Sequence, residues 1–190
     1  MGPTSRDALF GSYAGSERHL FLGWVASNAG FSTSSPAEGR EVVGQALVGV
    51  AAFLKARPDV VSVNYSGLES SPWHQLQLKN APKGGGPVLA FEIAGGVDAG
   101  RAFVDALELH SLAANIGDVR SLAIHPATTT HSQLSEAEQA TAGVSLGLVR
   151  LSVGIENVVD ILNDLDKDFT AAAAVREGAA TPTAATPANA

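Results

Sequence analysis

The order of strand-like and helix-like segments between residues 87 and 153 leaves few folds open to this chain. Short apolar or β-branched runs predict strands at 87–93, 111–115, 121–125 and 148–153. Helical spacing of apolar side chains predicts helices at 97–109 and 135–142, and Ser135 with Glu138 has the spacing of a capping box. The order β-α-β-β-α-β is typical of a split β-α-β sandwich of the ferredoxin-like kind. It predicts an α+β fold with helices on one face of the sheet.

The segments on either side of this region set the expected domain boundaries. Before it, the patterns predict a helix at 41–56, a strand at 60–65 and a short helix at 73–80. After it, apolar residues from Val158 to Phe169 predict a long amphipathic helix. We therefore expect a poorly defined segment over 1–40, one domain over 41–172, and a disordered tail of Ala, Thr and Pro over 173–190.

Charge and composition exclude several classes of function. Twelve Lys and Arg against 19 Asp and Glu give a formal net charge of -7, which argues against a general nucleic-acid-binding protein. There is no cysteine, so disulfides, thiolate catalysis and cysteine-ligated metal sites are excluded. No run approaches the roughly 20 apolar residues of a membrane helix, and the charged N-terminal stretch is a poor signal peptide. We expect a cytoplasmic protein without membrane or nucleic-acid partners.

Arg150 lies inside the last predicted strand of the sandwich, where a charged side chain is unusual. Strict alternation places Val149 and Leu151 on one face of the sheet and Arg150 on the other. Burying an arginine is costly unless it is paired, and its planar guanidinium suits a carboxylate or a phosphate. Two interpretations follow from the pattern: Arg150 binds an anionic ligand, or it is a structural arginine that is exposed or ion-paired.

The segment 115–131 gathers most of the other polar residues that suggest chemistry. His125 and His131 are candidate metal ligands, but their spacing matches no helical ligand pair, and they also suit a structural role in an irregular loop. A ligand-facing loop is a further interpretation, since loops at strand ends often carry function. The glycines at 84–86 lack the Gly-Lys-Ser/Thr of a phosphate loop, and no serine lies in a nucleophile-elbow context.

Two long stretches of the sequence resemble one family of enzymes. The stretch NIGDVRSLAIHPATTTHSQLSEAEQATAGVSLGLVRLSVGIENVVDILNDL resembles the C-terminal domain of the Cys/Met-metabolism pyridoxal-phosphate (PLP) enzymes. The upstream stretch DVVSVNYSGLESSPWHQLQLKNAPKGGGPVLAFEIAGG is similar to the O-acetylhomoserine sulfhydrylase branch of this family. Asn115 also fits this branch, because the lyases more often have serine at that position. The resemblance covers about residues 46–172. It implies the small C-terminal domain of a fold type I PLP-dependent transferase.

The resemblance also implies roles for individual residues. In the family, the arginine of the RLSVGIE motif binds the α-carboxylate of the amino-acid substrate, and that position is Arg150 here. By the same resemblance, Asn115 lies beside the carboxylate and Thr130 lies near the same pocket. The motif residues Ser121, His125 and His131 are interpreted as structural.

The cofactor chemistry of the family is only partly represented in this sequence. The family holds PLP on a lysine as a Schiff base, and its sulfhydrylases convert O-acetylhomoserine and sulfide into homocysteine and acetate. The lysines of this chain are Lys55, Lys79, Lys83 and Lys167, and none has the Ser/Thr-x-x-Lys setting of the Schiff-base lysine. We therefore expect no catalytic residue in this chain, weak or no PLP binding, and no turnover by the chain alone.

Three functions remain compatible with these observations. The first is a homocysteine-forming transferase, or the part of one that binds O-acetylhomoserine. The second is a non-catalytic truncated homologue that forms a homo-oligomer or associates with a full-length enzyme. The third is a small-molecule-binding module. Cofactor binding separates the first from the others, and the size of the assembly in solution separates the second from the third.

Overall fold

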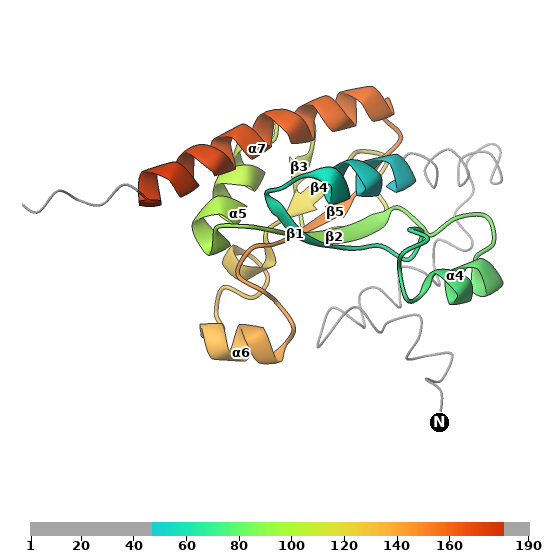
Figure 1. Ribbon diagram of the computed structural model, residues 1–190, viewed down its shortest axis with the longest axis horizontal. Coiled ribbons are helices and arrows are strands. Elements are labelled where there is room, and N and C mark those ends of the chain that lie inside the picture. Colours follow the sequence, from blue (N-terminus) through green and yellow to red (C-terminus); the bar gives the residue numbers. More distant parts are fainter. Residues whose placement is uncertain (1–46, 181–190) are drawn as a thin grey trace, which may run out of the picture.

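A computed structural model describes residues 47–180 of the chain (Figure 1). Residues 47–56 are helical. The strands that follow are β1 (Val60–Asn64), β2 (Val88–Ile93), β3 (Ser111–Leu112), β4 (Leu122–Ile124) and β5 (Leu148–Ser152). The helices are α4 (His74–Asn80), α5 (Gly96–Ala106), the 3-10 turn η1 (Pro126–Thr128), α6 (Glu136–Thr141) and α7 (Val158–Ala180). None of the helices in this part of the chain has the length and apolar composition needed to cross a membrane.

The five strands form one mixed sheet in the order β1-β2-β5-β4-β3. β2 pairs antiparallel with β1 and β5, and β5 pairs antiparallel with β4. β3 lies parallel to β4. β5 is therefore the central strand, and its Arg150 lies between Ala90 of β2 and Ile124 of β4.

One face of the sheet carries the apolar core. The helical residues 47–56, α5 and α7 lie over this face (Figure 1). At its centre, rings from β2, α5 and α7 meet: the centroids of Phe91, Phe103 and Phe169 are 4.8–5.9 Å apart. Val149 and Leu151 of β5 are fully buried in the same cluster. The alternation predicted for this strand is confirmed.

α5 ends at Ala106, before the predicted end at 109, because a side chain of α7 accepts the next backbone hydrogen bonds. Asp164 Oδ1 accepts from the N–H groups of Glu108 and Leu109 at 3.1 and 3.0 Å. Asp164 Oδ2 accepts from the N–H of His110 at 3.1 Å and lies 2.7 Å from His110 Nδ1. These bonds compete with continuation of the helix and turn the chain toward β3.

The predicted ferredoxin-like arrangement is wrong in two respects. β2 and β3 are joined through α5, but both β5 and β4 lie between them, and β3 and β4 are parallel neighbours instead of a hairpin. In addition, α6 lies away from the sheet, and α7 packs beside α5 (Figure 1). Side-chain size explains this, since α6 has no large apolar residue, whereas α7 buries Ile161, Leu165 and Phe169. The α+β class, with a mixed sheet and helices, is confirmed.

Helix α7 continues past the predicted domain end at 172, as far as Ala180. Alanine is the strongest helix former, and four alanines follow one another at 171–174. The expected disorder from 173 therefore does not hold over 173–180. The predicted segment 1–40, the start of the helix at 41–56 and the end of the tail lie outside the described residues.

Candidate functional site

Arg150 lies on the face of β5 opposite the core. It is 3% exposed, so the interpretation as an exposed arginine is wrong. Its Nη2 donates to the main-chain carbonyl oxygens of Ala114 and Asn115 at 2.7 and 3.3 Å. The guanidinium is thus fixed against the loop that leaves β3.

The loop at 113–121 brings Asn115 to Arg150. Because β3 and β4 are parallel, the chain must run back along the length of the sheet before β4 begins. An antiparallel pair would need only a short hairpin turn. On this return path the loop passes Arg150. The structure therefore joins two of the three predicted site residues, through the carbonyl of Asn115, while the residue itself is exposed.

Residues that follow Arg150 along the chain anchor this loop. Ser152 Oγ accepts from the N–H of Gly117 at 3.1 Å. The carboxylate of Glu156 accepts from the N–H and the Oγ of Ser121 at 2.7 and 2.9 Å. Ser121 Oγ in turn accepts from the N–H of Gly154 at 2.9 Å. A Cβ at Gly154 would collide with the carbonyl of Val119, so the close approach of the two segments requires glycine there.

His125 organises the next loop, which carries the HPATTTH motif. Its Nε2 lies 2.8 Å from the carbonyl oxygen of Leu146, which can only accept, so Nε2 bears the proton. Nδ1 then accepts from the hydroxyl of Thr128 at 2.9 Å. Burial lowers the pKa of His125, which favours this neutral ring. A Cβ at Gly100 of α5 would collide with the ring. These contacts support a structural role for His125.

Thr130 is exposed, and its Oγ1 lies 2.9 Å from Nδ1 of His131. Within residues 47–180 no hydrogen bond joins Thr130 to Arg150. The loop around it is held by Gln139 of α6, whose Nε2 donates to the carbonyl oxygens of Ala127, His131 and Leu134 at 3.2, 2.9 and 3.3 Å. Among the described residues, a hydrogen bond therefore joins Thr130 to His131 and not to Arg150, and its place near the substrate pocket stays a prediction.

Glu156 and Gln139 are the residues that sequence reasoning missed. Glu156 belongs to the RLSVGIE motif, but its partner Ser121 is 35 positions earlier in the chain, so the pair cannot be recognised from local spacing. Gln139 follows directly after the capping box of Ser135 and Glu138, which is confirmed. Gln139 is buried, and its partners are main-chain carbonyls of the loop before α6, so no pattern within the short helix indicates its role.

The residues present do not fit PLP on their own. A Schiff base needs a lysine beside the substrate site, and all four lysines are exposed on the surface. Lys55 Nζ donates to Ser70 Oγ at 2.6 Å beside β1, and Lys167 Nζ lies 3.3 Å from Glu108 on α7's outer face. Lys79 and Lys83 lie at the end of α4 and in the loop after it.

Comparisons with known proteins agree with this part of the structure. The chain is 57% identical over 122 residues to O-acetyl-L-homoserine sulfhydrylase of Corynebacterium glutamicum, which covers 64% of this chain and 28% of that protein. It is 45% identical over 124 residues to L-methionine gamma-lyase of Pseudomonas putida, covering 65% of this chain and 31% of that protein. The chain thus spans less than a third of the length of these relatives.

A solved structure gives the same result in three dimensions. It is described as an O-acetylhomoserine (thiol)-lyase of Campylobacter jejuni with N'-pyridoxyl-lysine-5'-monophosphate. The TM-score is 0.64 at 40% identity, over 71% of this chain and 32% of that one. A family model described as Cys/Met metabolism PLP-dependent enzyme matches residues 43–170. This chain therefore belongs to the Cys/Met metabolism PLP-dependent enzyme family.

Proposed function

We propose that this chain supplies the substrate-carboxylate part of an O-acetylhomoserine sulfhydrylase-type site, with Arg150 as the carboxylate ligand. The observation that carries the proposal is the fixed guanidinium. Arg150 points away from the core on the central strand, and Ala114 and Asn115 hold its Nη2. The identity of 57% to a sulfhydrylase, against 45% to a methionine lyase, supports this branch of the family.

The chemistry of the guanidinium suits this role. It presents five N–H donors in one rigid plane and matches a carboxylate through two parallel hydrogen bonds. Two carbonyl contacts to the same nitrogen set the orientation of that plane before any ligand arrives. Because Arg150 is 3% exposed, a carboxylate reaches it only when the groups that cover it move aside. Binding then replaces the contacts made by these covering groups with charge-assisted hydrogen bonds to the carboxylate.

In this proposal Asn115 lies beside the carboxylate and Thr130 at the edge of the same pocket. The contact between Arg150 and the carbonyl of Asn115 supports the first assignment. The second assignment rests on family membership alone. We expect no turnover by the chain alone, because none of its four lysines has the family's Schiff-base setting.

Titration of the isotopically labelled chain with O-acetyl-L-homoserine tests the carboxylate assignment. Nuclear magnetic resonance should show shifts of the Arg150 side-chain N–H signals and of the Asn115 and Gly117 amides. The same compound with its carboxylate converted to an amide should not bind. Arg150→Lys keeps the charge but loses the planar fork, so the affinity should fall about tenfold.

Arg101→Gln is the matched control, since Arg101 is an exposed arginine of α5. It should leave the titration unchanged. Equal binding of the amide, or unchanged affinity in a folded Arg150→Lys variant, would contradict the role of Arg150. Competition with L-methionine tests the branch, and the proposal requires O-acetyl-L-homoserine to bind more tightly.

Addition of PLP to the purified chain tests the absence of a cofactor site. No visible absorption band of a lysine-bound cofactor should develop. A band that disappears on replacing one of the four lysines by alanine would show that the chain completes the site by itself.

Association with a full-length homologue is a second candidate function. A full-length partner would supply the Schiff-base lysine, which none of the four lysines in this sequence provides in the family's Ser/Thr-x-x-Lys setting. Sedimentation of the chain with and without the C. glutamicum sulfhydrylase tests it, and the candidate requires a complex larger than either component.

A further inference from the structure

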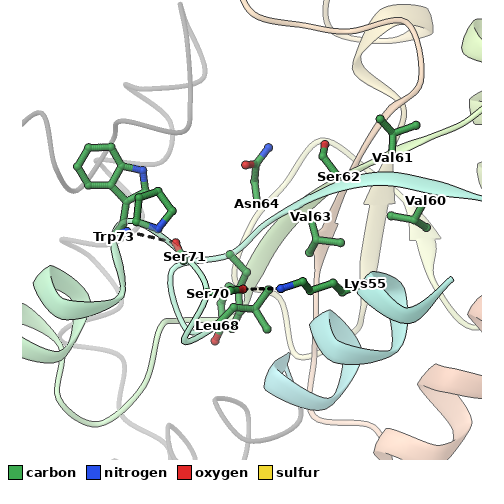
Figure 2. A pocket seen from close by; sticks show the side chains of 12 residues that line it. Lys55, Val60, Val61, Ser62, Val63, Asn64, Leu68, Ser70, Ser71 and Trp73 are labelled. Atoms are coloured by element: carbon green, nitrogen blue, oxygen red, sulfur yellow. Dashed lines mark hydrogen bonds between the residues drawn. The ribbon is translucent and has the colours of Figure 1, made fainter. Parts of the chain in front are cut away.

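A slot of about 310 Å³ runs along the outer edge of β1, two strands away from Arg150. Every residue of β1 lines it, so the slot follows the edge of the strand and not one face. Figure 2 shows Ser62 and Asn64 on one side of the strand, with Val63 and the Lys55–Ser70 hydrogen bond on the other. The residues that line the slot are Lys55, Val60–Tyr65, Leu68 and Ser70–Trp73.

The edge that faces the slot carries main-chain groups available for pairing. β1 is the first strand of the sheet, and within residues 47–180 it pairs only with β2. The N–H of Ala94 donates to Asp59, so the even-numbered residues of β2 turn their main-chain groups toward β1. Their partners Ser62 and Asn64 turn back toward β2. Alternation therefore points the N–H and C=O of Val63 outward, into the slot.

The opposite wall is a separate piece of structure that is held in place. Residues 65–74 form successive turns, with hydrogen bonds from Leu68 to Tyr65, from Ser71 to Leu68 and from His74 to Ser71. Lys55 fixes the wall from the helix at 47–56 through Ser70. The slot is thus bounded by an edge strand on one side and a preformed wall on the other.

The chemistry of the lining favours one class of occupant. Val60, Val63 and Leu68 are apolar, and Lys55 is the only charged residue among the described residues that line the slot. Among the described residues, Lys55 Nζ has a hydroxyl and no carboxylate as its partner. An extended segment with alternating apolar side chains and one acidic side chain would match the strand edge, the apolar lining and the ammonium group together.

We propose that the slot binds an extended peptide segment with an acidic side chain, which adds as a strand to β1. Such pairing gives affinity through main-chain hydrogen bonds and specificity through alternate side chains. A second copy of this chain fits less well, because each copy carries the wall 65–74 beside its own β1, and two paired edges would bring both walls together. The β-bulge at Val61 limits the pairing register to the residues that follow it.

Fluorescence anisotropy with labelled synthetic peptides tests the proposal on the full chain. The probe is acetyl-Thr-Val-Asp-Val-Thr-amide, and the matched probe has Lys in place of Asp. The acidic probe should bind and the basic probe should not. N-methylation of alternate amides of the acidic probe should abolish binding, because it removes the main-chain donors.

Two variants of the chain locate the site. Val63→Pro removes the outward N–H, which an edge strand tolerates, and should weaken binding at least about tenfold. Lys55→Gln should weaken binding of the acidic probe about threefold. Lys79→Gln is the control, since Lys79 is an exposed lysine outside the slot, and it should change nothing.

Failure of the acidic probe to bind, or binding unchanged in Lys55→Gln, would overturn the proposal even if Val63→Pro does not fold. Self-association of the chain that competes with the probe would identify a second copy as the occupant and would also overturn it.

Discussion

The two faces of β5 fix their side chains in different ways. On one face, Val149 and Leu151 are fully buried in the aromatic cluster, where stabilisation follows the apolar area removed from water and has no direction. On the other face, Arg150 and Ser152 hold the loop at 113–121 through hydrogen bonds, which depend on the position of single atoms. The core face should therefore respond to changes in volume, and the site face to changes of one donor or acceptor.

The largest effect is expected on the core face. Phe169 is 1% exposed and contacts both Phe91 and Phe103, so Phe169→Ala should lower the free energy of unfolding by about 3–5 kcal/mol through lost burial and a cavity. Urea denaturation measures this change. Val159→Ala is the control on the same helix, since Val159 is 57% exposed, and should cost less than about 0.5 kcal/mol. Equal effects of the two variants would contradict the position of the core.

Asp164 is a polar exception on the core side. Asp164→Ala leaves three backbone N–H groups and His110 without their acceptor, so the free energy of unfolding should fall by about 3 kcal/mol. Burial opposes ionisation, but hydrogen bonds from His110 and the backbone hold the pKa of Asp164 below its usual value. The stabilisation is therefore present above the unfolded pKa and is lost as the pH falls below it.

Acid denaturation of both proteins checks this assignment. The difference in unfolding free energy between the original chain and Asp164→Ala should be constant near neutral pH and should shrink in acid below about pH 4. A difference that instead grows in acid would show that Asp164 is not ionised in the folded chain.

A smaller effect is expected at the anchor of the site loop. Glu156→Gln replaces one of the two acceptor oxygens that bind Ser121, so the free energy of unfolding should fall by about 1–2 kcal/mol. Hydrogen exchange of the Ser121 and Gly154 amides should accelerate more than exchange in β2. Glu136→Gln, at an exposed position of α6, is the matched control and should leave exchange unchanged. Uniform acceleration would mean that Glu156 supports the whole fold and not this loop.

The smallest effect should have the opposite sign. Burial, together with the charges of Asp164 and Glu108, raises the pKa of Asp168 to about 7. The folded chain therefore keeps this proton to higher pH than the unfolded chain does, and stability falls as the pH rises from about 4 to 7. Asp168→Asn removes this loss and should raise stability above pH 7 by about 1 kcal/mol. Thermal unfolding at pH 4 and pH 8 measures it, and a larger gain at pH 4 would contradict the sign.

The local patterns of the sequence predicted most elements because they depend on neighbouring residues. Alternation in LVRLSV placed Arg150 opposite the core, and the Ser135–Glu138 pair marked the start of α6. The same patterns misplaced the ends of α5 and α7. Asp164 ends α5 from 54 to 56 positions away, and no pattern within the helix itself reports such a partner.

The candidate site was predicted in part for the same reason. Arg150 and Asn115 were identified from motifs of the family, and the contact between them is present through the carbonyl of Asn115. Thr130 came from the same motifs but is not joined to Arg150 by a hydrogen bond within residues 47–180. Glu156 and Gln139, which anchor the loops, were missed. Their hydrogen-bond partners lie in other loops, and only the folded structure brings those partners close.

By itself, the sequence determined the family, the α+β class, the face of β5 on which Arg150 lies, and the lack of a Schiff-base lysine in its family setting. These follow from residue identity and from periodicity, which act over a few positions. Only the tertiary structure decided that β3 and β4 are parallel, that α7 covers the core in place of α6, and that the loop at 113–121 returns past Arg150. Each of these features depends on burial and hydrogen bonds between residues that are far apart in the sequence, so local patterns do not report them.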